Sequence, residues 1–120
     1  MREDIIDHVK AYLIEKYDCH ALILYGSFEN ETYTDESDID IIGFCDKDER
    51  QNDTNIIDTR QLDAWIYPTE MMERYEELLH IHAGKILWDE RQLCCKLLEG
   101  INKLFNGGAK ALRIEQIDFQ

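Results

Sequence analysis

The amino-acid sequence predicts one domain of the α/β (α+β) class, built around a mixed β-sheet. Apolar residues recur at helical spacing near the N-terminus, short apolar runs typical of buried strands follow, and helical periodicity returns in the second half. The predicted order is helix, strand, loop, strand, strand, helix, strand, helix, which indicates helices layered on a sheet. A chain of 120 residues, 44% of them hydrophobic, is long enough for a single core.

The first half of the chain is assigned from local patterns. Residues 3–17 predict an amphipathic helix, because apolar side chains recur every three or four positions. The apolar run 21–25 stops at a glycine, as a buried strand does. The polar stretch 28–37 predicts a loop or short irregular helix, and 38–44 predicts a second strand. Residues 46–55 have almost no apolar side chain and predict a solvated loop.

The second half is assigned in the same way. Its predicted elements are a strand over 61–67, a helix over 70–80, a strand over 85–88 and a helix from Asp89 to about Phe105. Thr69 is the predicted N-cap of the first helix. Asp89 is the predicted cap of the second, with Gln92 at the capping-box position. Asn106-Gly107-Gly108 is expected to end that helix.

The charge is strongly negative and unevenly distributed. The formal net charge is -13, and residues 1–70 alone carry 18 acidic and 6 basic side chains. A free nucleic-acid binder needs lysine and arginine to displace counterions, so this class is disfavoured. No apolar run is long enough for a membrane span, and the charged start Met1-Arg2-Glu3-Asp4 is unlike a signal peptide. We therefore expect a cytoplasmic protein.

The four cysteines, Cys19, Cys45, Cys94 and Cys95, form no C-x-x-C pair. We expect reduced thiols that pack as small hydrophobic side chains. A zinc site with His80 and His82 is disfavoured, because adjacent cysteines on a helix point about 100° apart.

One group of acidic residues has a spacing that suits chemistry. The first predicted strand ends in Gly26-Ser27, and ten residues later the sequence reads Ser37-Asp38-Ile39-Asp40. Because strand side chains alternate, Asp38 and Asp40 face the same side. Asp63 lies on the next predicted strand, on the face opposite Leu62, Ala64 and Ile66. Neighbouring strands are about 4.8 Å apart, so Asp63 could lie beside the pair.

Three converging carboxylates repel one another unless a cation lies between them. Hard oxygen donors of this kind suit Mg²⁺, which completes its coordination with substrate phosphates. Gly26 has no side chain, so a phosphate could approach the backbone amides there, and Ser27 adds a hydroxyl. Ser37 is expected to support the aspartates. Each feature alone is common in solvated strands and turns, and the combination carries the hypothesis.

Two other interpretations of these segments are weaker. Asp38, Asp40, Gly43 and Glu49 fall at EF-hand positions, but Ile42 stands where an oxygen ligand is needed and the flanks are strand-like. Trp65 and Tyr67 share the Asp63 face and could stack on a base, although strand aromatics more often serve packing.

The stretch LILYGSFENETYTDESDIDIIGF resembles the nucleotidyltransferases of the DNA polymerase beta-like superfamily. Their signature is Gly-Ser, a spacer, Ser-Asp-x-Asp and a third Asp on a later strand, here Gly26, Ser27, Ser37, Asp38, Asp40 and Asp63. The small size and residues 78–92 resemble the minimal nucleotidyltransferases (MNT type) that include the partner of HEPN toxins. The resemblance implies the polymerase beta-like fold, with helices on one side of a mixed sheet. It also implies a single domain over 1–120 that lacks the C-terminal helices of longer members.

The resemblance also implies a mechanism. Asp38 and Asp40 would hold two Mg²⁺ ions (or Mn²⁺), and Asp63 would help bind one and activate an acceptor hydroxyl. Gly26 and Ser27, supported by Ser37, would bind ATP or another nucleoside triphosphate. The acceptor would attack the α-phosphorus, and pyrophosphate would leave.

The acceptor is left open by the sequence. A hydroxyl of a protein partner, as in MNT/HEPN toxin–antitoxin pairs, ranks first. A small cationic acceptor of the aminoglycoside type ranks second, because the acidic first half would attract it. A catalytically silent binding module is the third alternative, since residues 28–36 contain four acids and no base, which disfavours a triphosphate. Arg60, Lys85 and Arg91 are the candidate compensating cations. The oligomeric state is open, a homo-oligomer included.

Overall fold

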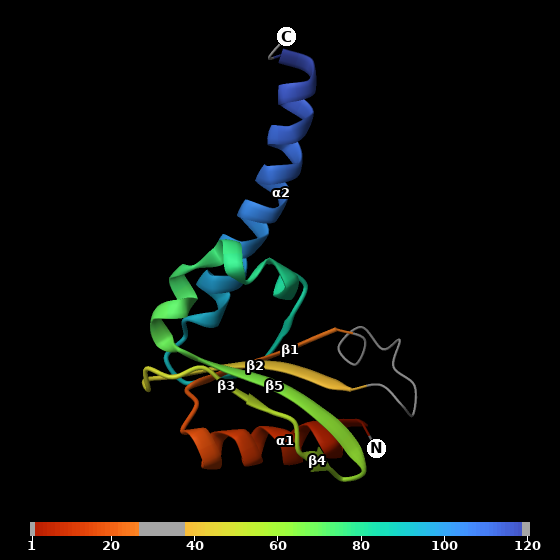
Figure 1. The fold of residues 1–120 in the computed structure, drawn as a ribbon, viewed down its shortest axis with the longest axis vertical. Helices are drawn as coiled ribbons and strands as arrows, with labels where there is room; N and C mark the ends of the chain where they lie inside the picture. Colours follow the sequence, from red (N-terminus) through yellow and green to blue (C-terminus); the bar gives the residue numbers. More distant parts are fainter. Residues whose placement is uncertain (1, 27–37, 119–120) are drawn as a thin grey trace.

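The computed structural model describes residues 2–26 and 38–118 (Figure 1). Side chains are described for residues 4–26 and 38–106. The helices are α1 (Arg2–Tyr17) and α2 (Cys94–Asp118). The strands are β1 (Ala21–Tyr25), β2 (Ile39–Cys45), β3 (Gln51–Asp53), β4 (Ile56–Ile57), β5 (Arg60–Pro68) and β6 (Lys85–Asp89). The predicted segment 28–37 lies outside the described residues.

The described strands form a mixed sheet in the order β3-β5-β2-β1-β6, with β4 pairing separately with β5. Strand β1 is antiparallel to both β2 and β6, whereas β2 and β5 are parallel. The N-terminal ends of β2, β5 and β6 therefore meet the C-terminal end of β1 at one edge of the sheet. This edge is where the Gly26 and aspartate motifs lie.

Helices cover both faces of the sheet (Figure 1). Helix α1 packs one face through Ile6, Val9 and Leu13, against residues such as Ile41 and Leu62. The start of α2 and the segment between β5 and β6 pack the other face, around Ile42 and Phe44. The α+β class and the mixed sheet are confirmed, but the expectation that the helices lie on one side is wrong. Both sheet faces are apolar, so both need cover.

The helix expected over 70–80 is replaced by three short 3-10 helices, η1 (Thr69–Glu73), η2 (Tyr75–Glu77) and η3 (Leu79–Ile81). Thr69 does not cap them, because its Oγ1 lies 2.8 Å from Asp46 Oδ1 and 3.0 Å from the Cys45 carbonyl. Tyr75 packs so closely on Gly100 of α2 that a Cβ there would lie 2.5 Å from its ring. Contacts with distant residues therefore set the backbone here.

Helix α2 begins later and ends later than predicted. The Asp89 carboxylate caps it as expected, accepting hydrogen bonds from the backbone N–H groups of Leu93 (2.8 Å) and Cys94 (3.1 Å). Gln92 has a positive φ of 58° and is not part of a capping box. The Asn106-Gly107-Gly108 segment does not end the helix, which continues to Asp118 and projects away from the sheet (Figure 1).

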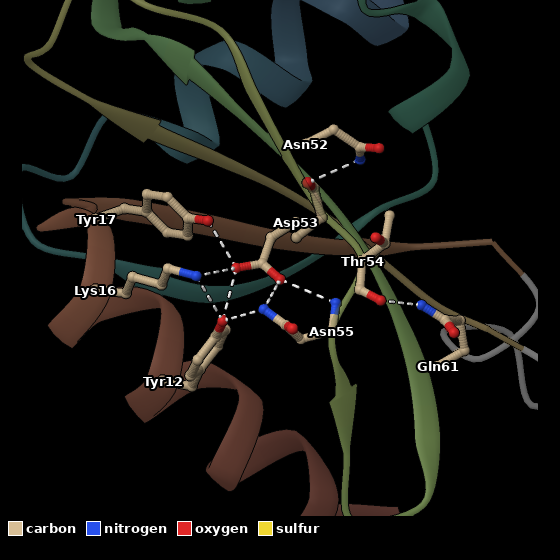
Figure 2. Close-up of polar contacts among 9 residues, drawn as sticks. Tyr12, Lys16, Tyr17, Asn52, Asp53, Thr54, Asn55 and Gln61 are labelled. Atoms are coloured by element: carbon tan, nitrogen blue, oxygen red, sulfur yellow. Dashed lines mark hydrogen bonds and ion pairs between the residues drawn. The ribbon is translucent and has the colours of Figure 1, made fainter.

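Residues 46–55 are not a solvated loop throughout, because they contain β3 and lead into β4. Asp53 at the end of β3 is only 4% exposed. Its carboxylate accepts hydrogen bonds from the hydroxyls of Tyr12 (2.8 Å) and Tyr17 (2.6 Å) on α1 (Figure 2). Polar composition alone could not reveal a strand that is held by a buried carboxylate.

The remaining expectations concern membranes and cysteines. Within residues 2–26 and 38–118, no helix has the length and apolar character that a membrane span needs. Cys19, Cys45 and Cys94 are buried free thiols, and Cys95 is an exposed free thiol, so Cys95 departs from the packing role expected for all four.

Candidate active site

The register of two parallel strands places two of the three predicted aspartates side by side. Asp40 on β2 pairs directly with Asp63 on β5. Paired residues of parallel strands point to the same face, and their backbones are about 4.8 Å apart. Asp38 is exposed and immediately precedes β2, two positions from Asp40. The three carboxylates therefore share one face at the edge of the sheet.

The carboxylates influence one another electrostatically. Burial, the charge of Asp63 and the charge of Asp38 together raise the pKa of Asp40 from 3.8 to about 6. A raised pKa means that ionised Asp40 is unfavourable in this environment. A cation between the carboxylates would reverse this effect.

Gly26 is fitted against Asp40 at the end of β1. Its φ is +80°, a conformation that residues with a Cβ rarely adopt. A Cβ there would lie 2.4 Å from Asp40 Oδ2. The glycine therefore brings backbone next to the carboxylate that pairs with Asp63. Ser27 and Ser37 lie outside the described residues.

We predict that Gly26→Ala disrupts the site. The new methyl group would displace the Asp40 carboxylate and would require a strained backbone, which together cost about 1–3 kcal/mol of folding stability. Thermal unfolding of the variant measures this loss. The matched control is Gly107→Ala, because Gly107 lies within α2 and alanine suits a helix interior. A Gly26→Ala variant as stable as the wild type would contradict the close approach.

Asn52 holds Asp63 in position, and sequence reasoning missed it. Its Nδ2 donates hydrogen bonds to Asp63 Oδ1 (2.9 Å) and to the Ala64 carbonyl (3.1 Å). Asn52 lies on β3, next to Trp65 of β5 in register. It could be found only after β3 was known to be a strand.

Tyr25 forms another side of the site. It pairs with Asp40 across β1 and β2. Burial and the charges of Asp40 and Asp63 raise its pKa to about 12, so the phenol is neutral at pH 7. The ring of His80 packs edge-on against it, with ring centroids 5.3 Å apart. Burial lowers the pKa of His80. Neither residue was predicted for this site, because the register of β1 with β2 places Tyr25 beside Asp40 and His80 reaches it from η3.

The three candidate compensating cations occupy different places. Lys85 pairs with Leu24 at the same sheet edge as Gly26, and Arg60 begins β5 three residues before Asp63. Arg91 instead forms an ion pair with Asp46, which follows the far end of β2, about 20 Å along the strand from Asp40. Arg91 is therefore too distant to compensate charge at this site.

The carboxylates of Asp40 and Asp63 suit a magnesium ion whose other ligands are phosphate oxygens of a substrate and water. Among the described residues, no group of three or more His, Cys, Asp or Glu side chains is arranged to hold a metal ion, which applies to Asp38, Asp40 and Asp63 and to the disfavoured zinc site. Mg²⁺ is typically bound by one or two carboxylates and completes its octahedron with water and phosphate oxygens. Asp40 and Asp63, with the raised pKa of Asp40, provide such a partial site.

Comparison with known proteins identifies the family. Residues 7–87 match the family described as "Polymerase beta, Nucleotidyltransferase". The chain belongs to this family. The match spans α1 through most of β6 and includes Gly26, Asp38, Asp40 and Asp63. None of the curated proteins matches the sequence.

A solved structure supports the polymerase beta-like fold. The nucleotidyltransferase-like protein from Exiguobacterium sibiricum 255-15 superimposes with a TM-score of 0.56 at 12% sequence identity. The match covers 82% of this chain and 38% of that protein, so this chain spans well under half of the relative's length. At this identity the likeness concerns the fold.

Proposed function

We propose that this domain, spanning residues 1–120, transfers a nucleoside monophosphate, most simply AMP from ATP, to an acceptor hydroxyl in the presence of magnesium. The observation that carries the proposal is the pairing of Asp40 with Asp63 beside the Gly26 backbone. Membership of the polymerase beta family supports the reaction class. We assign Asp38, Asp40 and Asp63 as metal-binding and catalytic residues, and Gly26, Ser27 and Ser37 as nucleotide-binding residues.

The strand order suggests how the substrates are arranged. Gly26 directly follows β1, and Asp63 is on β5, with Asp40 of β2 between them. The β- and γ-phosphates therefore belong near β1, and the acceptor belongs near β5. The acceptor oxygen forms a bond to the α-phosphorus as the bond to the β-phosphate oxygen breaks. Asp63 takes the hydroxyl proton, and pyrophosphate leaves.

Magnesium would be held by Asp38, Asp40 and Asp63 together with phosphate oxygens, and when bound it would neutralise the charge that develops on the phosphates. The chain's own residues perform the positioning. Asn52 orients Asp63, and Gly26 keeps the phosphate path free of side chains next to Asp40.

The acceptor that we favour is a hydroxyl on a protein partner, as in MNT/HEPN pairs. The support is the resemblance of residues 78–92 to the minimal nucleotidyltransferases. A small cationic acceptor is the second candidate, favoured by the excess of acidic over basic residues in positions 1–70.

Calorimetry with ATP and Mg²⁺ tests the proposal. We expect saturable binding by the wild type and at least about tenfold weaker binding by Asp63→Asn, because a metal ligand is lost. Asp48→Asn is the matched control, since Asp48 is exposed in the loop after β2 and its loss changes the net charge equally. Absence of ATP binding by the wild type would favour the silent module and overturn the proposal.

The transfer itself is tested by incubation with labelled ATP, Mg²⁺ and the protein encoded next to this chain. We expect the label to appear on that neighbour and to disappear in Asp63→Asn. If the wild type binds ATP but labels no neighbour, the protein acceptor is wrong.

A further inference from the structure

An aromatic stack continues from the candidate site along β5. Trp65 and Tyr67 follow Asp63 at alternate positions, so all three side chains lie on one face. The two rings are stacked, with centroids 6.1 Å apart and planes at 10°. Trp65 is 38% exposed, so part of its indole is accessible to a ligand.

A guanidinium of the chain itself already lies over the ring of Tyr67. Arg50 lies over the Tyr67 ring, with Cζ 5.4 Å from the centroid. Its Nη2 is held by Glu77 Oε1 at 3.7 Å and donates a hydrogen bond to Met71 Sδ at 3.5 Å. A planar cation of this chain therefore already lies on the Tyr67 ring.

The near face of Trp65 has a different environment. The Trp65 indole has two faces along β5. Tyr67 stacks on one of them, so the other is on the Asp63 side. Residues two apart on a strand are separated by about 6.6 Å, and Asn52, which pairs with Trp65 in register, reaches Asp63 from the β3 side of this interval. A group in that position would contact an indole on one side and the carboxylates of Asp63 and Asp40 on the other.

We propose that the near face of Trp65 binds a guanidinium of the acceptor, an arginine side chain next to the reacting hydroxyl, and that Trp65 thereby positions the acceptor beside Asp63. This inference rests on the proposed function, because it assigns the acceptor to the β5 side of the site. Trp65 is a positioning residue, since it contacts the acceptor away from the reacting atoms.

The chemistry of the position selects a cation. Indole is the aromatic ring that binds cations best, and guanidinium groups stack flat on it. The neighbouring carboxylates of Asp63 and Asp40 add electrostatic attraction for a cation. The arrangement of Arg50 on Tyr67 shows the same pairing at the other end of the stack.

Nuclear magnetic resonance of the indole N–H groups tests the proposal. The chain has two tryptophans, and Trp88 serves as the internal control because its Nε1 is buried. Titration with N-acetyl-arginine amide should shift the Trp65 signal saturably and leave the Trp88 signal unchanged. N-acetyl-citrulline amide, which is planar but neutral, should bind at least about threefold more weakly. Equal shifts with both compounds, or no shift at Trp65, would overturn the proposal.

Two variants separate this inference from the proposed function. Trp65→Phe assigns the signal and retains a ring, whereas Trp65→Ala removes it. Trp65→Ala should bind ATP and Mg²⁺ like the wild type in calorimetry, because the nucleotide lies toward β1. It should raise KM for the acceptor without the change in pH profile expected of Asp63→Asn. Loss of ATP binding in Trp65→Ala would place the ring on the nucleotide side and refute the inference. Failure of ATP binding in the wild type would instead refute the function.

Discussion

Asp40→Asn should be more thermostable than the wild type at pH 7 without magnesium, although it should lose binding of ATP and Mg²⁺. The reason is that ionised Asp40 is unfavourable in the folded protein, where burial, Asp63 and Asp38 raise its pKa from 3.8 to about 6. A neutral amide of the same shape removes this cost. The same change removes a proposed metal ligand.

The direction of the stability change follows from the linkage between protonation of Asp40 and folding. A carboxyl whose pKa is higher in the folded state contributes no penalty below about pH 3.8, where both states are protonated. The penalty grows as the pH rises and is complete above about pH 6. After allowance for partial solvent exposure, it is about 1–2 kcal/mol, or about 5 °C in melting temperature. Thermal unfolding at pH 4 and pH 7 measures the difference.

The same melting temperatures are also measured with Mg²⁺ present. Mg²⁺ should raise the melting temperature of the wild type at pH 7 and should have little effect on Asp40→Asn, because binding to the folded state stabilises it. Asp48→Asn, an equal change of charge in the exposed loop after β2, should respond to Mg²⁺ like the wild type. An Asp40→Asn variant that is less stable than the wild type at pH 7 would contradict the electrostatic coupling of the three aspartates.

The parts of this site that the sequence predicts are those fixed by local pattern. The apolar run of β1 and the glycine that follows it locate one side of the candidate site. Alternation along β5 places Asp63 on the face opposite Leu62, and the structure has it there, beside Asp40. Strand parity is a local property, so it can be inferred without knowing how strands pair.

The other parts depend on contacts between distant residues. Asn52 contacts Asp63 because β3 pairs with β5, and Tyr25 faces Asp40 because β1 pairs with β2. No periodicity in the sequence reveals these pairings. Similarly, the segment 69–81 has a helical apolar pattern but folds as 3-10 turns under contacts with α2, such as Tyr75 on Gly100. Tertiary packing here overrides local propensity.

Asp53→Ala should produce the largest loss of stability that we predict for a single side chain, about 3 kcal/mol. Five hydrogen-bonding contacts converge on this carboxylate (Figure 2). They come from Tyr12, Lys16 and Tyr17 on α1 and from the backbone and side chain of Asn55. Removing the acceptor leaves the buried Tyr17 hydroxyl without this partner and takes the same acceptor from the half-buried Tyr12 hydroxyl. Urea unfolding at pH 7 measures the loss.

The pH dependence has the opposite sign to that of Asp40. Burial by itself would raise the pKa of Asp53, but the hydrogen bonds from Tyr17, Asn55 and Tyr12 outweigh it and lower the pKa to about 2. The ionised carboxylate therefore stabilises the fold above about pH 3.8, and this contribution is lost as the pH falls through about 2. Asp53→Asn should show a deficit at pH 7 that becomes smaller below pH 4.

The sites at which amide hydrogen exchange accelerates show whether Asp53 stabilises the contact between α1 and β3 or the whole fold. If Asp53 fastens α1 to β3, amide hydrogen exchange in Asp53→Asn should accelerate first in β3 and at the C-terminal end of α1, while β1 and β2 remain protected. Because Asn52 on β3 orients Asp63, loosening β3 should also weaken ATP and Mg²⁺ binding, although Asp53 lies on the opposite sheet face, against α1. Asp48→Asn should change neither measurement. Uniform acceleration of exchange, with ATP binding unchanged, would mean that Asp53 serves overall stability and that the aspartate site does not depend on it.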